Sequence, residues 1–162
     1  MFDGICEDNV PVEFSMIEGD KVEIIYEVPA HGSNTDVYIK ANNVAPSRSR
    51  YWFSTNTTTT YEDGLVARTG EERMGTLEGT LTLYNGLLRF NGTDNRGQDN
   101  GVGISSALWY NTTSVSNISF SIGGYLRIRK LSSGLTNLTN KVFYGQERPD
   151  PEIGAIWLRP IE

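Results

Sequence analysis

An alternation of apolar and polar residues at every second position restricts the fold of this chain more than any other feature. In the stretch KVEIIYEV, the apolar residues Val22, Ile24 and Tyr26 fall on one side, and the acidic residues Glu23 and Glu27 fall on the other. Successive side chains of a β-strand point to opposite faces of its sheet. The pattern therefore predicts a strand with one face in a core and one face in solvent.

A second local signal predicts how two such strands are joined. In GTLTLYNGLLRFNG, alternating apolar residues end at Leu83, pass through Asn85-Gly86 and resume at Leu88. Both central residues of a type I′ turn need positive φ, which Asn and Gly adopt more readily than other residues. The stretch predicts a β-hairpin with Asn85 and Gly86 at its turn.

Similar alternating segments recur to the end of the chain, and we expect eight to ten short antiparallel strands in all. The composition agrees, since the 162 residues include 17 glycines and 10% aromatic residues. The only place where a short helix could form is the stretch YEDGLVARTGEERMG. We therefore predict an all-β fold, a β-sandwich of the jelly-roll type, in a single domain over residues 1–162.

Charge and the N-terminal residues exclude several classes of protein. The net charge of −6 argues against a nucleic-acid-binding module, which normally carries a basic face. No apolar run reaches the length of a transmembrane helix, so we expect no membrane insertion. The first residues, MFDGICEDNVPVEF, lack the basic and apolar regions of a signal peptide. The single cysteine, Cys6, cannot form an internal disulfide, which favours folding in a reducing cytoplasm.

Oxygen-bearing side chains crowd one glycine-rich stretch, FNGTDNRGQDNGVG at residues 90–103. Asp94, Asn95, Asp99 and Asn100 could bind calcium, but their spacing does not match the EF-hand pattern and no glutamate lies at a fitting distance. Asp, Asn and Gly are also the residues that turns prefer. We interpret the stretch as a long surface loop that could contact a ligand, and we expect no metal ion and no cofactor.

Motifs for catalysis are weak in this sequence. The only histidine, His31, lies two residues from Ser33, and such neighbours do not supply the nucleophile, base and orienting acid of a triad. A pair of Cys6 and His31 has no local signature either. The 20 acidic residues could include a pair of glycosidase carboxylates, but nothing in the sequence selects one pair. We therefore expect that the chain is not an enzyme.

Two arginines precede an aromatic run in the stretch SRSRYWF. If Tyr51 and Phe53 point into the core, alternation places Trp52 on the opposite face together with Arg48 and Arg50. Aromatic and arginine side chains are frequent where proteins bind partners. Packing of an edge strand is the competing explanation. We take Arg48, Arg50 and Trp52, with the four Asp and Asn residues named above, as candidate ligand contacts.

The C-terminal part of the chain resembles a known class of protein. In WYNTTSVSNISFSIGGYLRIRKLSSGLTNLTNKVFYG, residues 109–145, a strand that carries Ile118 and Ile122 is followed by a polar loop and by a strand that ends in Tyr144-Gly145. This order resembles the C-terminal half of β-sandwich proteins on tailed-phage virions, found in tail-tip, fibre and head-decoration modules. The hairpin stretch EGTLTLYNGLLRFNG also looks like one that these modules carry.

A second likeness competes with the first. The stretches TLYNGLLRFNG, LWYNTTS and GGYLRIRKLSS are also similar to the sugar-binding tip domain of bacterial fimbrial adhesins. Those domains normally carry a signal peptide and a disulfide, and this chain shows neither. Virion proteins fold in the host cytoplasm before assembly, which agrees better with a lone cysteine. We therefore prefer the virion resemblance and keep an adhesin of the bacterial surface as the alternative.

The virion resemblance implies a non-enzymatic structural protein on the surface of a phage-like particle. Its partners would be capsid or tail subunits, and also a host-surface glycan if it serves as a tail or fibre module. By analogy with decoration and fibre proteins, we expect a homo-oligomer and favour a trimer. Many symmetric copies would compensate for weak single contacts.

Overall fold

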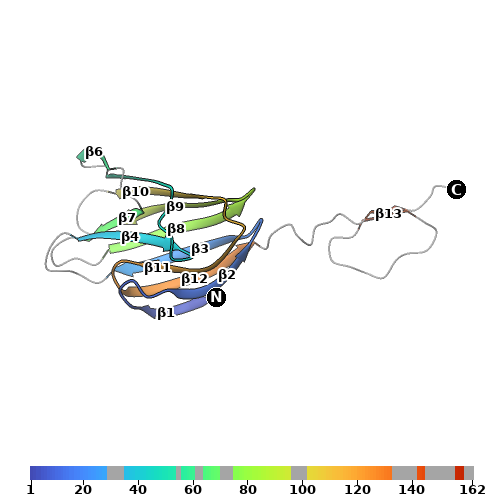
Figure 1. Ribbon diagram of the computed structural model, residues 1–162, viewed down its shortest axis with the longest axis horizontal. Coiled ribbons are helices and arrows are strands. Elements are labelled where there is room, and N and C mark those ends of the chain that lie inside the picture. Colours follow the sequence, from blue (N-terminus) through green and yellow to red (C-terminus); the bar gives the residue numbers. More distant parts are fainter. Residues whose placement is uncertain are drawn as a thin grey trace.

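The computed structural model describes residues 1–28, 35–53, 56–60, 64–69, 75–95, 102–132, 142–144 and 156–158. Every helix or strand assigned within these residues is a β-strand, which confirms the all-β prediction (Figure 1). The strands are β1 (Phe2–Cys6), β2 (Val12–Ile17), β3 (Lys21–Val28), β4 (Thr35–Ala41), β5 (Arg48–Phe53), β6 (Asn56–Thr60), β7 (Leu65–Thr69), β8 (Gly75–Tyr84), β9 (Leu87–Asn95), β10 (Val102–Tyr110), β11 (Ser114–Phe120), β12 (Gly124–Ser132), β13 (Val142–Tyr144) and β14 (Ile156–Leu158). None of the described segments is a helix that could span a membrane.

Fourteen strands are assigned in the described part of the chain, more than the eight to ten that alternation predicted. Some of the additional strands lack the alternating pattern. Strand β6 consists of Asn and Thr alone, and β7 buries Leu65, Val66 and Ala67 in succession. A fully buried strand shows a continuous apolar run instead of alternation. Strand β7 lies in the stretch where a short helix was conceivable, so that expectation is wrong for residues 65–69.

Two antiparallel sheets pack against each other, consistent with the predicted β-sandwich (Figure 1). One sheet has eight strands in the order β1-β12-β3-β8-β9-β10-β5-β6, and the other has four in the order β2-β11-β4-β7. Strands β13 and β14 pair with each other and run parallel, whereas only antiparallel strands were expected.

Four strand pairs of the sandwich are nested in the sequence. Strand β1 pairs with β12, β2 with β11, β3 with β8, and β4 with β7. Consecutive members of this series alternate between the two sheets. Strands β5 and β6 interrupt the series after β4, and β9 and β10 interrupt it after β8. These four strands extend the eight-stranded sheet beyond β8, and we call them the extension.

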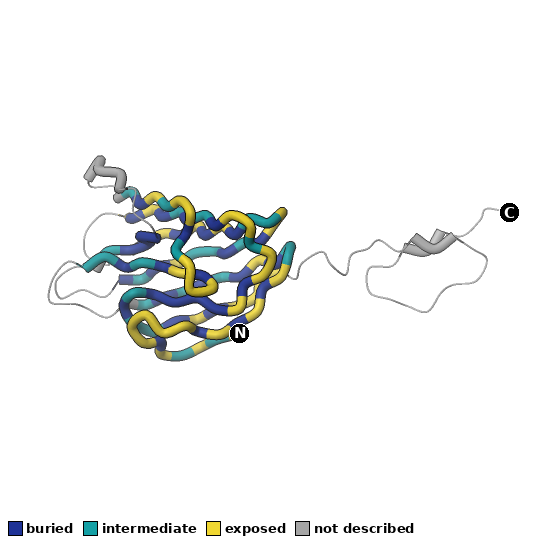
Figure 2. Tube along the Cα trace, in the orientation of Figure 1, coloured by how far each residue is buried: buried dark blue, intermediate teal, exposed yellow. Residues whose placement is uncertain are grey.

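The core between the sheets comes from the inward positions of both. Along β2, Val12, Phe14 and Met16 are buried while the residues between them are exposed. Buried and exposed residues alternate in the same way along many strands (Figure 2). Tyr26 of β3 stacks on Phe120 of β11 with ring centroids 4.1 Å apart. Because β3 and β11 belong to different sheets, this ring pair joins the two layers.

The hairpin that the sequence predicts at Asn85-Gly86 is confirmed. The two residues have φ values of 52° and 70°, and Tyr84 pairs with Leu87 across the turn. The Glu18 carboxylate accepts hydrogen bonds from both turn amides. Asn85 and Gly86 thus have the positive φ angles that the turn requires. The side chain of Glu18, which follows β2, binds the turn.

Two glycines lie opposite each other within this hairpin. Gly79 of β8 and Gly92 of β9 are register partners, and the ring of Phe90 lies against both. A Cβ at Gly79 would lie 2.5 Å from Phe90 Cε2, and a Cβ at Gly92 would lie 2.7 Å from Phe90 Cζ. The absence of side chains at these positions makes the space that the buried ring occupies.

We expect Gly79→Ala to lower the free energy of unfolding by about 1–3 kcal/mol, the usual cost of overpacking a core. Gly4→Ala is the control, because its Cβ would meet no atom closer than 3.6 Å. Urea unfolding followed by tryptophan fluorescence measures both variants. If Gly79→Ala and Gly4→Ala have equal free energies of unfolding, the ring of Phe90 does not fill the space over Gly79.

A buried tyrosine makes stability depend on alkaline pH. Burial is the largest cause that raises the pKa of Tyr26, and the charges of Cys6 and Asp8 raise it further. The Tyr26 hydroxyl donates a hydrogen bond to the backbone oxygen of Ile122. Above the ordinary tyrosine pKa of about 10, the unfolded chain therefore loses this proton while the folded protein keeps it.

We accordingly expect the contribution of Tyr26 to stability to be complete below about pH 9 and to decline as the pH rises through 10. Urea unfolding between about pH 8 and pH 11 measures the decline. In Tyr26→Phe the phenol is absent, so the free energy of unfolding should depend less steeply on pH. A variant with the same pH dependence as the natural protein would assign the effect to other groups.

Candidate functional site

Strand β5 positions the candidate residues of the SRSRYWF stretch. Tyr51 points inward and is 1% exposed. Arg48 and Arg50 are exposed and Trp52 is half-buried, so all three lie on the outer face of the sheet. The predicted division of these residues between the two faces is confirmed. The side chain of Phe53 lies outside the described part of the structure.

Strand β10 completes a shallow hollow beside these residues. In the register of β5 and β10, Trp52 lies opposite Ile104, and Arg50 lies opposite Ser106. These four residues line a hollow on the outer face of the eight-stranded sheet. Ile104 is 51% exposed, so apolar surface remains open to solvent next to an indole and a guanidinium.

The same surface continues along β10 and across β9. Arg48 lies opposite Leu108, which in turn lies opposite Arg89 of β9. The Arg48 guanidinium lies 5.9 Å from the ring centroid of Tyr110, an exposed residue at the end of β10. We call this surface the arginine–aromatic face, and its members are Arg48, Arg50, Trp52, Arg89, Ile104, Ser106 and Tyr110.

Charges are arranged differently on the two halves of this sheet. On the half away from the extension, Arg129 of β12 forms an ion pair with Glu23 of β3, with 3.0 Å between Nη2 and Oε2. The three arginines of the arginine–aromatic face form no ion pair with any residue that the structure describes. In a chain of net charge −6, these cations remain available to an external anion.

Asp94 has a different environment from the one that the sequence suggested. It lies in β9, is 1% exposed, and accepts hydrogen bonds from Tyr51 Oη at 2.7 Å and from the Arg68 backbone nitrogen at 3.0 Å. The Arg68 guanidinium binds Asp36 at 2.6 Å and lies 5.6 Å from the Tyr51 ring centroid. We call Asp36, Tyr51, Arg68 and Asp94 the anchor network.

The interpretation of residues 90–103 as one long surface loop is therefore wrong for its two ends. Residues 90–95 belong to β9 and residues 102–103 to β10, because Phe90 and Asp94 continue the inward alternation of the hairpin. Asn95 is exposed at the end of β9. Asp99 and Asn100 lie outside the described residues. Of the four candidate contacts in this stretch, Asp94 is a buried structural residue.

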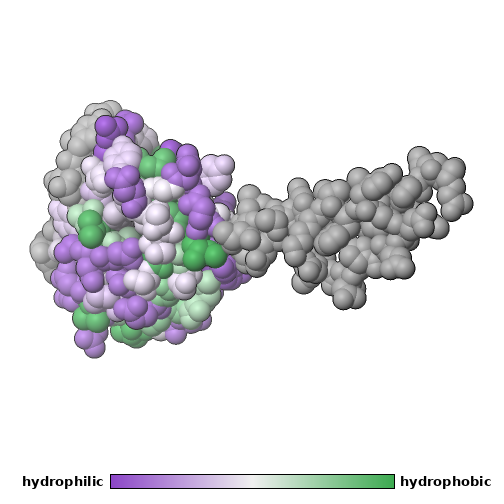
Figure 3. All heavy atoms as spheres, turned by 45° about the vertical axis from the view of Figure 1, so that its right-hand side comes forward, coloured by the Kyte–Doolittle hydropathy of each residue, from purple (hydrophilic) through white to green (hydrophobic). Residues whose placement is uncertain are grey.

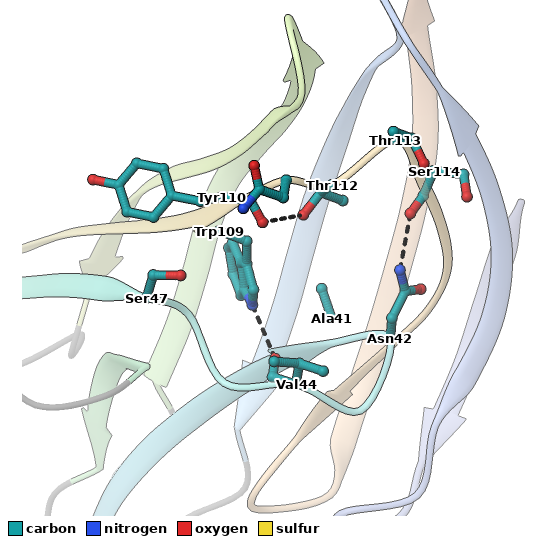
Figure 4. A pocket seen from close by; sticks show the side chains of 10 residues that line it. Ala41, Asn42, Val44, Ser47, Trp109, Tyr110, Thr112, Thr113 and Ser114 are labelled. Carbon is teal, nitrogen blue, oxygen red and sulfur yellow. Dashed lines mark hydrogen bonds between the residues drawn. The ribbon is translucent and has the colours of Figure 1, made fainter.

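A second hollow lies at the end of the sandwich, between the β4–β5 turn and the β10–β11 loop (Figure 4). Its polar groups bind one another. Trp109 Nε1 donates a hydrogen bond to the Val44 oxygen at 2.9 Å, and Asn42 Nδ2 donates one to the Ser114 oxygen at 2.8 Å. Trp109 is only 3% exposed. The contacts hold the turn against the loop, and the indole presents no open face to a ligand.

The other sequence candidates for chemistry do not come together in the described residues. These residues contain no group of three or more His, Cys, Asp or Glu that could hold a metal ion. Cys6 is buried, its Sγ donates to the Gly124 oxygen at 3.3 Å, and burial raises the pKa of the thiol. A protonated thiol is a poor nucleophile. His31 and Ser33 lie outside the described residues.

Sequence reasoning missed the residues that surround Trp52. Strand β10 reads VGISSALWY, and both sets of alternate positions contain apolar residues, so its outer face cannot be identified from alternation. The register with β5 is what brings Ile104 and Ser106 to Trp52 and Arg50. Protein-family models, curated proteins and solved structures were compared with the chain, and none matches it. The functional argument therefore depends on the arginine–aromatic face itself.

The anchor network gives a prediction about stability. We expect Asp94→Asn to lower the free energy of unfolding by about 2 kcal/mol, the size of a hydrogen bond to a buried charged group. A double-mutant cycle with Tyr51→Phe should give a coupling of about 1 kcal/mol or more, since the two side chains are in contact.

Asp3→Asn is the matched control, because Asp3 accepts a hydrogen bond from the hydroxyl of Tyr125 at the surface. Its effect should stay within about 0.5 kcal/mol. Urea unfolding measures all the variants. If the Asp94 and Tyr51 substitutions have additive effects on the free energy of unfolding, then their contact does not stabilise the fold, which would contradict the prediction.

Proposed function

We propose that this chain is a non-enzymatic structural protein on the surface of a phage-like virion, and that its arginine–aromatic face binds a host-surface glycan. The observation that carries the proposal is a half-buried indole on the outer face of the sheet, next to two arginines that have no ion-pair partner among the described residues. Aromatic and arginine side chains dominate the binding energy of protein interfaces. The virion setting comes from the resemblance of residues 109–145 to tailed-phage modules.

The strand pairing supports this assignment. Nested antiparallel pairs that alternate between two sheets are what a jelly roll requires, and we propose that the sandwich is a jelly roll into which the extension is inserted. Double-sheet jelly rolls are common in viral capsid proteins and in lectins. Because one fold supports many functions, this likeness is an analogy, and the site remains the main support.

The chemistry of the face suits a sugar. A sugar ring has an apolar side that packs on an aromatic ring, and Trp52 and Ile104 offer adjoining apolar surface. Hydroxyl and guanidinium groups of Ser106 and Arg50 line the same hollow and can bind the sugar hydroxyls. The hollow is shallow, so a single site would bind weakly. A trimer on a particle with many copies would multiply such weak contacts.

The surface of the sandwich is mixed rather than uniformly apolar on the side that Figure 3 shows. Hydrophilic and hydrophobic residues are interspersed there. Such a surface is typical of a protein that works in water and contacts its partners through limited patches. If no glycan binds, head decoration through contacts with capsid subunits is the role that the proposal leaves.

A glycan array tests the proposed function. We expect the natural protein to bind a subset of glycans and Trp52→Ala to bind them about tenfold more weakly or not at all, as for other aromatic residues at the centre of a site. Tyr125→Ala is the control, since Tyr125 lies on the same sheet but outside the extension. Equal loss in both variants, or none in either, would contradict a site at Trp52.

The genes beside the coding sequence test the virion setting independently. We expect genes for capsid or tail proteins. Genes for a chaperone and an usher would contradict the virion proposal and favour the fimbrial adhesin. Glycan binding at Trp52 is compatible with either setting.

A further inference from the structure

We infer that the ligand of the arginine–aromatic face is an acidic saccharide, one whose carboxylate or sulfate groups bind Arg50 and Arg48 while a sugar ring lies on Trp52. This inference rests on the proposed function, because it specifies the class of glycan that the same site takes. It makes an additional claim about charge that can fail while glycan binding at Trp52 stands.

The distribution of charge on the extension is the first support. The outward positions of β5, β9 and β10 in the described structure carry three arginines, Arg48, Arg50 and Arg89, and no Asp or Glu. Crossing the sheet from Trp52, the first carboxylate is that of Glu78 on β8, three strands away. The chain as a whole is acidic, with a net charge of −6. A surface with arginines and no carboxylates therefore differs from the average composition of the chain.

The second support is that these cations form no ion pair with any carboxylate in the described part of the chain. Exposed arginines of an acidic protein commonly pair with neighbouring carboxylates, as Arg129 does with Glu23. The interaction of Arg48 that the structure describes is with the ring of Tyr110, which leaves its N–H groups directed to no carboxylate. A planar guanidinium binds a carboxylate or sulfate with two parallel hydrogen bonds.

The third support is the spacing of the groups along the face. Arg48, Arg50 and Trp52 occupy every second position of β5, so they lie on one side over about 13 Å at about 3.3 Å per residue. The strip is longer than one sugar ring, and it has two cations in succession with an apolar platform at one end. An oligosaccharide with acidic groups at intervals matches this order. A neutral sugar would offer neither arginine an anionic partner.

A nucleic acid is also a polyanion, and the face discriminates against it. Single-strand binding modules stack successive bases on several aromatic rings inside a positively charged groove. Along β5 the described outer face has one indole, and the surface is a shallow hollow in an acidic chain. We therefore choose the saccharide, and a nucleic acid becomes one arm of the test.

Calorimetry or biolayer interferometry on the full chain tests the inference with four probes. They are a uronate-containing oligosaccharide, the same oligosaccharide with its carboxyl groups reduced to alcohols, inorganic polyphosphate, and a single-stranded oligonucleotide. We expect the acidic oligosaccharide to bind about tenfold or more tightly than its reduced form, and its affinity to fall when salt rises from about 50 mM to about 300 mM. Polyphosphate and the oligonucleotide should bind more weakly.

Variants locate the effect. Arg50→Gln and Arg48→Gln should each lower the affinity for the acidic form more than that for the reduced form, so that most of the preference between the two oligosaccharides is lost. Trp52→Ala should weaken both sugars. Arg127→Gln is the matched control, since Arg127 is exposed on the outer face of β12, outside the extension, and should have no effect.

The outcomes separate the inference from the proposed function. Equal affinity for the two sugars, with loss on Trp52→Ala, would overturn the inference and keep glycan binding. Polyphosphate or the oligonucleotide binding as tightly as the acidic sugar would overturn it as well. Absence of binding to either sugar, in this assay and on the array, would overturn both the inference and the proposed glycan binding, and head decoration would be the role that is left. Circular dichroism of each variant confirms that it folds, so that a loss of binding is not a loss of structure.

Discussion

The carboxylate of Asp94 is the polar contact that joins the extension to the smaller sheet. Strands β5, β9 and β10 lie beyond the nested pairs that close the two sheets, so they need their own attachment to the smaller sheet. Asp94 supplies it by accepting hydrogen bonds from Tyr51 on β5 and from the backbone of Arg68 on β7. A buried carboxylate is costly unless such donors surround it, and here they come from both sheets. Because these hydrogen bonds need particular donors in particular places, they allow only one position of β5 and β9 relative to β7. A purely apolar contact would not impose this requirement.

The division of labour within the larger sheet follows from this arrangement. The half that contains β1, β12 and β3 has an ion pair between Glu23 and Arg129 on its outer face, and its inner face packs on the smaller sheet through Tyr26 and Phe120. The extension has the same kind of inner face, but the arginines of its outer face form no ion pair with any described residue. The part of the sheet that is least necessary for closing the sandwich is the part that carries the candidate site.

Local pattern was sufficient for many of the strands and for one side of the site. Alternation located strands such as β3, β8 and β9, Asn85-Gly86 located a turn, and the SRSRYWF stretch placed Trp52 opposite to Tyr51. The remaining features depend on pairing between distant segments. Asp94 looked like a turn residue, but it is buried and accepts hydrogen bonds from donors on Tyr51 and Arg68, 43 and 26 residues away. Likewise, the neighbours of Trp52 follow from the register of β5 with β10, and β7 lacks alternation because Leu65, Val66 and Ala67 are buried in succession.

Tyr51 and Trp52 are consecutive residues on opposite faces of β5, and their adjacency has an entropic consequence. The hydrogen bond that holds Tyr51 to Asp94 restrains the backbone on which the indole is mounted. A ligand that arrives at Trp52 then meets a platform whose conformation is already selected. Less conformational entropy is lost on binding than at a site on a flexible loop. More of the interaction energy is therefore available as binding affinity. A buried tyrosine that no ligand touches would in this way contribute to recognition through preorganisation.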